Sequence, residues 1–437
     1  DVHLALGAIR AALENGWEDR KFIASRTEGF EGLRQLAFSS TVAGHAQLAG
    51  VDPGVPATLA KALCRETPAA ILLGWGLHRH VHADIGVRAI DALCAVSGNI
   101  GVPGGGVSQG FEEYGPYDQS VWGEDLHPPR RKLSMARIAE GLEGASDPPV
   151  RVMVVSAANP ACMAPDSDAV ARAVASREFV AYMGHFMDDT ARLSHLFLPC
   201  ATFLEEDDVA ASYGHHYVGP VNKAMEPLGL CRPQFDIYQD LARRFPFAGE
   251  YVKPLEQWLE VICKPFLDKG FTLDDIRRGP LRDPDAPMVP WAQGAFPTPS
   301  GRFRFLGSDG EALPQAPAGG DGGYPLRLLT TGSPAHLCSE LTLAEHTPLA
   351  EARVHPDTGR SMGLQDDAPA WLESELGRVK VLAVFDPRQR RDVCLCRRGG
   401  WIAAGHGVNR VVPARESALG RGTPFYETRV KLAPSEE

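Results

Sequence analysis

The sequence predicts an α/β protein with two doubly wound α/β units, built on mainly parallel sheets, and a β-barrel at the C-terminus. In the first half of the chain, short apolar runs that end in glycine or asparagine turns alternate with segments of helical periodicity, which is typical of parallel sheets. In the last part, short strand-like runs are separated by turn residues, with little helix between them. That spacing is typical of a small barrel.

The first α/β unit is predicted within residues 1–115. Residues 2–15 have apolar side chains at helical spacing. Residues 69–73 form a short apolar run that ends in a glycine turn, and helical periodicity returns over 85–97. The order of strand, turn and helix indicates the start of an α/β unit.

The second α/β unit, expected within residues 116–245, repeats this order. A β-branched apolar strand over 150–156 is followed by a turn at Asn159 and a helix over 167–176. Further elements are expected at 178–183 (strand), 188–193 (short helix) and 195–198 (strand). Ligands in such sheets bind at the carboxyl ends of the strands, which is where the Asn159 turn falls.

Residues 246–322 are expected to connect these units to the barrel as irregular chain. Pro, Gly and Asp are frequent over 280–323, and only 301–305 has the character of a strand. The barrel itself is predicted over 323–437. Its expected strands are 326–331, 368–373, 379–385, 392–396 and 428–432.

Composition and charge exclude several classes of function. The chain of 437 residues has a net charge of −11, which argues against nucleic-acid binding, because that affinity comes from clustered Lys and Arg. No apolar stretch is long enough to span a membrane. The nine cysteines are scattered, so the sequence predicts neither a four-ligand metal site nor a disulfide framework, and a reducing, cytoplasmic compartment fits best.

Three polar or glycine-rich clusters each have a functional and an ordinary interpretation. His78, His80 and His82 alternate along the chain and are either metal ligands or loop residues that form hydrogen bonds. The carboxylates at 205–208 are either a catalytic pair or hard-metal site, or a solvated acidic run. The glycines at 104–106 are either a phosphate-binding backbone or a flexible connection.

Six motifs follow one another in an order that is typical of one enzyme family. They are Gly74-Trp75-Gly76-Leu77-His78, the glycine-rich stretch 97–106, Ser156-Ala157-Ala158-Asn159-Pro160, the block from Phe186 to Pro199 with Glu205, the segment 296–302, and the barrel landmarks Thr330-Thr331-Gly332, His355-Pro356-Asp357 and Asn409. Each motif alone is weak, but together they cover essentially the whole chain. In this order they resemble the molybdopterin oxidoreductases of the dimethyl-sulfoxide-reductase family.

The resemblance implies a cofactor in which two molybdopterin guanine dinucleotides chelate one molybdenum or tungsten ion. Glycine turns suit this ligand, because backbone amides approach its pyrophosphates and pterin edges with no Cβ in the way. The residues that the resemblance assigns to the cofactor are Asp1, Gly74, Trp75, Gly76, His78 and Gly105 in the first unit, Asn159, Phe186 and Thr190 in the second, and Thr331, Gly332, His336 and Asn409 in the barrel. The second set is expected to contact the guanosine portion. Glu205 is expected to be structural.

The chain departs from the family at several positions. Gly184 stands where the family has an aspartate that accepts hydrogen bonds from ribose hydroxyls, and Ser194-His195 stands in place of Ala-Asp. Residues 107–114 lack the arginine that follows the glycine stretch in formate dehydrogenases and nitrate reductases. Because a buried formate or nitrate needs a fixed cation, an oxygen-atom transferase, a hydroxylase or another relative is favoured over a formate dehydrogenase.

The resemblance also implies that the chain is the C-terminal two-thirds of the family's fold. The family's metal-ligating residue and its four-cysteine motif for a 4Fe-4S cluster are expected ahead of Asp1, on the same protein or on a companion chain. The expected function is a two-electron redox or oxygen-atom-transfer reaction on a small substrate, with an electron-transfer subunit among the expected partners. The alternatives are a non-redox pterin enzyme of the hydratase or transhydroxylase type, a pterin-binding scaffold without catalysis, and an α/β protein that binds another nucleotide.

Overall fold

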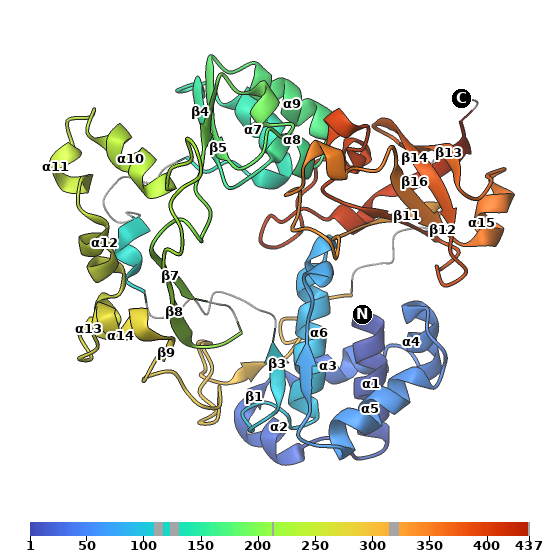
Figure 1. Cartoon of the computed structure of the whole chain (residues 1–437). Coiled ribbons are helices and arrows are strands. Elements are labelled where there is room, and N and C mark those ends of the chain that lie inside the picture. Colours follow the sequence, from blue (N-terminus) through green and yellow to red (C-terminus); the bar gives the residue numbers. More distant parts are fainter. Residues whose placement is uncertain (109–116, 123–130, 212–213, 314–322, 436–437) are drawn as a thin grey trace. The chain divides into compact units, whose positions relative to one another are not determined.

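The computed structural model describes residues 1–108, 117–122, 131–211, 214–313 and 323–435. These residues form two compact units, whose elements are labelled in Figure 1. Unit 1 consists of the described residues 1–108, 214–215 and 284–313. Unit 2 consists of 117–122, 131–211, 216–283 and 323–435.

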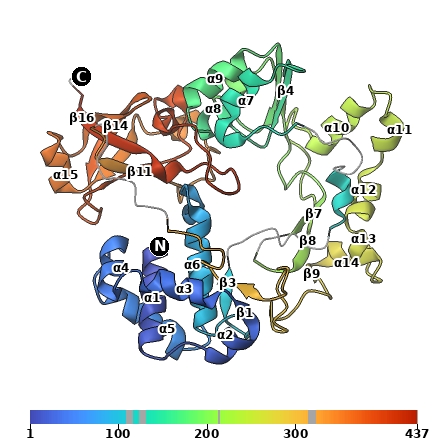
Figure 2. The same ribbon diagram turned by 180° about the vertical axis from the view of Figure 1, so that it is seen from behind.

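Unit 1 is mainly helical and is built around one helix. This helix, α1 (Val2–Glu14), is contacted by α4 (Val42–Ala49), α5 (Val55–Arg65) and α6 (Ala83–Val96), which Figure 2 shows from behind. The buried side of α1 is made of alanine, leucine, isoleucine and glycine. Because these side chains are mostly small, the neighbouring helices can approach closely.

Two short parallel strand pairs complete unit 1. β2 (Ala70–Leu72) pairs with β3 (Gly106–Ser108) and leads into the 3₁₀ turn η1 (Trp75–Arg79). β1 (Thr27–Glu28) pairs with β10 (Phe303–Arg304). The remaining helices are α2 (Arg20–Arg26), which is capped by Asp19, and α3 (Phe30–Phe38). The predicted order of strand, glycine turn and helix is confirmed, although β2 is shorter than expected.

Unit 2 begins with a parallel α/β layer. Its strands are β4 (Val152–Ser156), β5 (Phe179–Gly184) and β6 (Leu196–Pro199). Its helical elements are α7 (Ile138–Gly144), α8 (Pro160–Met163), α9 (Ser167–Ala175) and the 3₁₀ turn η4 (Ala191–Leu193). Side chains of α7 and α9 pack on one face of the sheet. Since the three strands are parallel, their carboxyl ends meet at one edge.

The middle of unit 2 contains helices where the sequence predicted irregular chain. They follow α10 (Gln234–Ala242), which lies within the predicted second unit, and are α11 (Ala248–Tyr251), α12 (Leu255–Ile262), α13 (Lys264–Leu267) and α14 (Leu273–Arg278). An antiparallel sheet of β7 (Asp208–Ala211), β8 (Tyr217–Val221) and β9 (Leu281–Arg282) packs beside them. The expectation of irregular structure from 246 onward was therefore wrong up to residue 278. All of these helices are short. α12 and α13 begin at or beside proline, and prolines at helix starts resemble loop composition in the sequence, whereas α14 begins after Thr272.

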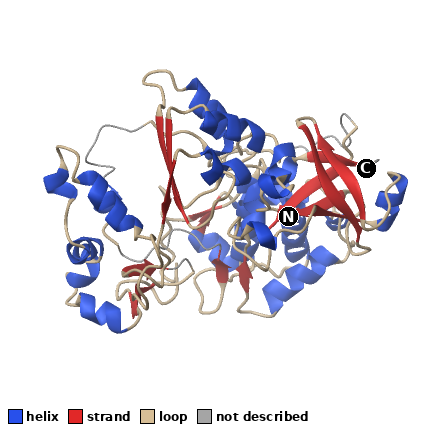
Figure 3. Cartoon of the chain, turned by 45° about the horizontal axis from the view of Figure 1, so that its top comes forward, coloured by secondary structure: helices blue, strands red, loops and turns tan. Residues whose placement is uncertain are grey.

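The C-terminal part of unit 2 is a closed six-stranded barrel, seen at the right of Figure 3. Its strands, in order around the barrel, are β11 (Leu326–Thr331), β15 (Val393–Arg397), β12 (Ala350–Val354), β14 (Gly377–Phe385), β13 (Ala368–Ser374) and β16 (Arg429–Pro434). Alternate residues of β11 are buried, as a half-exposed strand requires. Five of the six strands were predicted. The sequence missed β12 and the helix α15 (Pro356–Ser361) that follows it.

The predicted fold class is confirmed by the parallel sheets and by the closed barrel. No helix within the described ranges is both long and apolar enough to cross a membrane.

Glu205 ties two loops of unit 2 together, and we expect this tie to depend on pH. The carboxylate accepts hydrogen bonds from Thr202 N (2.7 Å), Thr202 Oγ1 (3.0 Å) and Leu228 N (2.6 Å). The backbone hydrogen bonds from Thr202 and Leu228 lower the pKa of Glu205. A carboxyl group whose pKa is lower in the folded state stabilises the fold above its unfolded pKa, and this contribution is lost as the pH falls through the folded pKa.

Glu205→Gln should therefore lower the melting temperature at pH 7, and the difference from the wild type should shrink below about pH 4, near the unfolded pKa of glutamate. Thermal unfolding followed by circular dichroism from pH 3 to pH 7 checks this. Glu14→Gln, at an exposed position on α1, serves as the matched control and should show little difference at any pH. A pH-independent difference for Glu205→Gln would contradict the assignment.

Candidate functional site

A cavity of about 410 Å³ lies at the carboxyl ends of β4 and β5 in unit 2. Its walls come from the turn after β4, from the end of β5 and the turn after it, and from a loop of the barrel part. The lining residues include Ala157, Asn159, Tyr182, Gly184, Phe186, Asp188, Cys338 and Ser339. Ala157 has a φ of 51°, which is uncommon for a residue with a Cβ. The position matches the general rule for ligand sites in parallel α/β sheets.

One wall of the cavity rests on a buried hydrogen-bond network that joins the two turns. The side-chain oxygen of Asn159 accepts hydrogen bonds from Thr190 Oγ1 (2.7 Å) and Thr190 N (3.3 Å). Thr190 Oγ1 in turn accepts one from Ala161 N (3.0 Å). Thr190 is fully buried, and Asn159 is 5% exposed. Thr190 therefore positions Asn159, which lines the cavity.

A second polar pair on the cavity wall is formed by Tyr182 and Asp188. The phenol of Tyr182 donates to Asp188 Oδ2 at 2.5 Å, and Asp188 Oδ1 accepts from Thr190 N and Ala191 N. Burial raises the pKa of Asp188. The hydrogen bonds from Tyr182 and from the backbone act in the opposite direction, but the net shift is upward. Burial, followed by the hydrogen bond to Asp188, raises the pKa of Tyr182 far above its usual value. The phenol therefore stays protonated and acts as the donor.

The barrel part is held against this end of the sheet by further buried polar contacts. Asp189 accepts from the backbone N–H groups of Ile402 (2.7 Å) and Ala403 (2.9 Å), which begin the 3₁₀ turn η6 (Ile402–Ala404). Asn159 Nδ2 donates to Ser339 Oγ at 3.4 Å. Because these groups are buried, each needs its partner, and the contacts fix the barrel loop as a wall of the cavity.

Asn409 takes part in the same attachment. Its Nδ2 donates to the backbone oxygens of Cys162 (3.2 Å) and Met163 (2.8 Å) at the end of α8. Arg410 Nε lies 3.0 Å from both carboxylate oxygens of Asp168. Asn409 Oδ1 is buried without a hydrogen-bond partner among the described residues. The structure thus places Asn409 between the α/β layer and the barrel, with one acceptor unused.

The other predicted barrel residues lie on the loop after β11. Thr331 O accepts a hydrogen bond from Arg398 N (2.9 Å), and a Cβ built on Gly332 would lie 4.0 Å from Arg398 Nη2. Within the described chain, Arg398 Nε is buried and has no hydrogen-bond partner. His336 is half-buried on this loop and does not line the cavity. Arg398 is therefore a candidate anion-binding residue that the sequence analysis missed.

Four of the predicted site residues of unit 1, Gly74, Trp75, Gly76 and His78, lie in or directly before η1. Gly74 precedes this turn, and a Cβ built on it would meet no atom within 4 Å. Trp75 is 50% exposed, and its ring lies 5.3 Å from that of His78. Gly76 lies within η1. Asp1 is exposed ahead of α1, next to Val2, which packs against α6.

Gly105 has a different role from the one expected of a phosphate-binding glycine. A Cβ built on Gly105 would collide with the backbone oxygen of Asn99 and lie 2.7 Å from Val102 Cγ2. The space beside Gly105 is therefore filled by the chain itself. Glycine is required there for the tight turn that starts β3.

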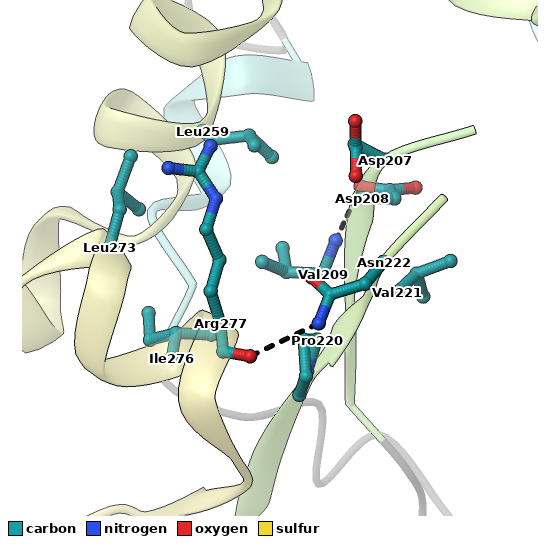
Figure 4. A pocket seen from close by; sticks show the side chains of 10 residues that line it. All are labelled: Asp207, Asp208, Val209, Pro220, Val221, Asn222, Leu259, Leu273, Ile276 and Arg277. Carbon is teal, nitrogen blue, oxygen red and sulfur yellow. Dashed lines mark hydrogen bonds between the residues drawn. The ribbon is translucent and has the colours of Figure 1, made fainter. Parts of the chain in front are cut away.

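Two other hollows of unit 2 suit the predicted cofactor less well. A hollow of about 910 Å³ beside α10 and α12 is lined by six carboxylate side chains and two basic ones, which disfavours an anionic dinucleotide. The hollow in Figure 4, between β7, β8 and α14, has room for about one water molecule. Asp207 and Asp208 line it, with Leu273 and Ile276 opposite. Both carboxylates are exposed, and they accept hydrogen bonds from the backbone of the hairpin, Asp207 from Lys223 N (3.0 Å) and Asp208 from Val209 N (2.8 Å).

No group of three or more His, Cys, Asp or Glu side chains that could hold a metal ion is found in the part of the chain that the structure describes. His78, His80 and His82 therefore do not come together as such a group. Of the segment 107–114, in which the sequence analysis noted the missing arginine, residues 109–114 lie outside the described residues.

The residues of unit 2 fit a dinucleotide. The cavity lies at the carboxyl ends of parallel strands. Outside its lining, Arg398 Nε and Asn409 Oδ1 are a buried donor and a buried acceptor without partners among the described residues. The sequence located Asn159 and Phe186 through the turns after β4 and β5, and both line the cavity. It did not identify Tyr182, Asp188 or Ser339, which only the fold brings to one cavity, nor Arg398.

Comparison with known proteins identifies the family. The model of the molybdopterin oxidoreductase family matches residues 14–244, and that of the molydopterin dinucleotide binding domain matches residues 336–429. The first match covers more than half of the chain. The chain belongs to the molybdopterin oxidoreductase family, which is a family of enzymes, and it carries the dinucleotide-binding domain of that family.

Individual relatives agree with this assignment. A probable oxidoreductase of Bacillus subtilis, YyaE, is 27% identical over 99% of this chain and 67% of its own length. Formate dehydrogenase H of Escherichia coli is 25% identical over 99% of this chain and 66% of its own length. The solved structure of acetylene hydratase from Pelobacter acetylenicus shares the fold, with a TM-score of 0.82 and 18% identity over all of this chain and 70% of that one. The chain thus spans about two thirds of the length of these relatives.

Thr190→Val tests the buried network. The substitution keeps the shape of the side chain but leaves Ala161 N without its acceptor and removes the short hydrogen bond to Asn159. An unsatisfied buried polar group costs about 1–3 kcal/mol, so we expect a clear loss in the free energy of unfolding measured with urea. Thr58→Val, at an exposed position on α5, should change it little. Equal, small effects of both substitutions would contradict the role of the network.

Proposed function

We propose that the full protein is a molybdenum or tungsten enzyme that performs a two-electron redox or oxygen-atom-transfer reaction on a small substrate. In this proposal the chain holds the two pterin guanine dinucleotides, through residues 1–115, 116–245 and 323–437. The observation that supports it best is the cavity at the ends of β4 and β5, which Asn159 and Phe186 line within the region matched by the family model. Phe186 offers an apolar face for a guanine ring, and Asn159 offers polar atoms for its edge or sugar.

The bound metal and its pterin ligands supply the exchange of electrons or of an oxygen atom with the substrate. The residues of the chain bind and orient this group. Arg398 Nε and the backbone at Thr331 and Gly332 are proposed to hold anionic or polar edges of a dinucleotide, because the Nε of the half-buried Arg398 is buried without a partner among the described residues and a guanidinium hydrogen-bonds an anion strongly. Gly74, Trp75, Gly76 and His78, with Asp1, are proposed to bind the other dinucleotide.

The metal and nucleotide content of the purified protein tests this function. The full-length protein, isolated from cells supplied with molybdate and tungstate, should contain about one metal ion and about two guanine nucleotides per chain, as the family's cofactor requires. Metal analysis, fluorescence of the oxidised pterin and release of GMP by acid measure these quantities. A protein that is folded but contains neither metal nor pterin would contradict the proposal.

A second measurement separates redox from non-redox chemistry. A protein named as an acetylene hydratase shares this fold, so the fold is compatible with a reaction that transfers no net electrons. The metal-loaded protein is therefore assayed with reduced and oxidised viologen dyes and a panel of N-oxides, S-oxides, nitrate and formate. Dye-coupled turnover of any of these supports the oxidoreductase. Metal-loaded protein without any turnover of electrons favours the hydratase or transhydroxylase type.

Two glycine substitutions should differ in their effects, one lowering the pterin content and the other lowering the stability of the fold. Gly74→Val places a side chain in the space that the proposal gives to the ligand, where a Cβ meets no atom of the chain. We expect an almost unchanged melting temperature and a lower pterin content. Gly105→Ala should instead destabilise the fold by about 1–3 kcal/mol, because its Cβ collides with Asn99 O. Unchanged pterin content in Gly74→Val would refute the binding role of this turn.

A further inference from the structure

Tyr182 and Asp188 present acceptor atoms on the cavity wall. Three hydrogen bonds reach the Asp188 carboxylate, two at Oδ1 from backbone N–H groups and one at Oδ2 from the Tyr182 phenol. A carboxylate has about four lone-pair sites, so one site on Oδ2 is left. The phenol of Tyr182 donates its only hydrogen to Asp188, so toward a ligand its oxygen can act only as a hydrogen-bond acceptor. Both side chains line the cavity, and together they offer acceptors for a pair of donors.

The place of this pair in the sheet indicates which donors it meets. Tyr182 lies near the carboxyl end of β5, and Asp188 follows that strand in the next turn. β5 is the second strand of a strand–helix–strand unit that begins with β4. In nucleotide-binding units of this kind, an acidic group after the second strand accepts hydrogen bonds from ribose hydroxyls. A ribose presents two neighbouring hydroxyl donors, which matches two neighbouring acceptors.

Gly184 makes the position of Tyr182 possible. A Cβ built on Gly184 would lie 2.5 Å from Cε1 and 2.9 Å from the hydroxyl oxygen of Tyr182. The ring also stacks on Phe197, with the ring centres 5.7 Å apart. Any larger residue at position 184 would therefore displace the hydroxyl from Asp188.

We propose that Tyr182 and Asp188 are the residues that bind the ribose hydroxyls of the guanine nucleotide, and that Gly184 is required to place them. This inference rests on the proposed cofactor-binding function and assigns one end of the dinucleotide to the cavity. It gives the cavity a preference for a ribonucleotide over a deoxyribonucleotide. It also assigns the pair a role in binding rather than in the chemical step.

The test uses full-length protein made in cells that cannot synthesise the pterin, with GDP and 2′-deoxy-GDP as probes in isothermal titration calorimetry. Wild-type protein should bind GDP more tightly than 2′-deoxy-GDP by roughly tenfold, the scale of one hydrogen bond to a charged group. In Tyr182→Phe and Asp188→Asn this ratio should fall toward one. Gly184→Ala should reduce the ratio in the same way while keeping both polar side chains.

Tyr238→Phe is the matched control, since Tyr238 is 44% exposed on α10 and does not line the cavity. It should keep the wild-type ratio. Circular dichroism and the melting temperature identify any variant that fails to fold, and Tyr182→Phe retains the ring that stacks on Phe197. An unchanged ratio in the folded Tyr182→Phe and Asp188→Asn proteins would overturn the inference.

Absence of GDP binding in the wild type would also overturn the inference, because the cavity would then not be a nucleotide site. That outcome is distinguishable from a failure of the proposed function, since the metal and pterin content of the cofactor-loaded protein is measured separately.

Discussion

The buried polar contacts between the barrel loops and the carboxyl ends of β4 and β5 are the constraint on which the rest of the candidate site depends. Asp189 holds the start of η6, Asn409 holds the end of α8, and Asn159 reaches Ser339. A buried polar group that loses its partner costs more than an ordinary contact contributes. The α/β layer and the barrel are therefore fixed against each other at this edge, and the cavity between their loops has a defined shape.

Part of the hydrogen-bonding capacity around the cavity is used to position the residues that line it. Thr190 and the backbone after β5 use their hydrogen-bonding capacity to fix Asn159 and Asp188. The other polar side chains that line the cavity are those of His185, Gln234, Ser339 and Glu340, together with Thr423, and its apolar wall includes Phe186 and Phe425. Pockets for nucleotides commonly combine an apolar wall with a few well-placed polar groups. The structure thus supports the binding of a defined ligand more directly than it supports any reaction.

The sequence predicted the parts of the fold that depend on local pattern. The five predicted barrel strands contain apolar or β-branched runs bounded by turn residues, whereas β12 (Ala350–Val354) buries two small alanines, which have low strand propensity, and was missed for that reason. Asn159 and Phe186 were found because turns after parallel strands are readable in the sequence. Tyr182, Asp188 and Arg398 were not found, because their role depends on neighbours that only folding brings together. The helices between 246 and 278 were missed because each is short and because α12 and α13 start beside proline.

The central claim is that the cavity at the ends of β4 and β5 holds the nucleotide end of a pterin dinucleotide. A cryo-electron microscopy or crystal structure of the metal-loaded, full-length protein tests it most directly. The account predicts density for a guanosine between Phe186 and the barrel loop, with its ribose hydroxyls within hydrogen-bond distance of Tyr182 and Asp188. Two dinucleotides resolved elsewhere in the protein, with this cavity free of both, would contradict it.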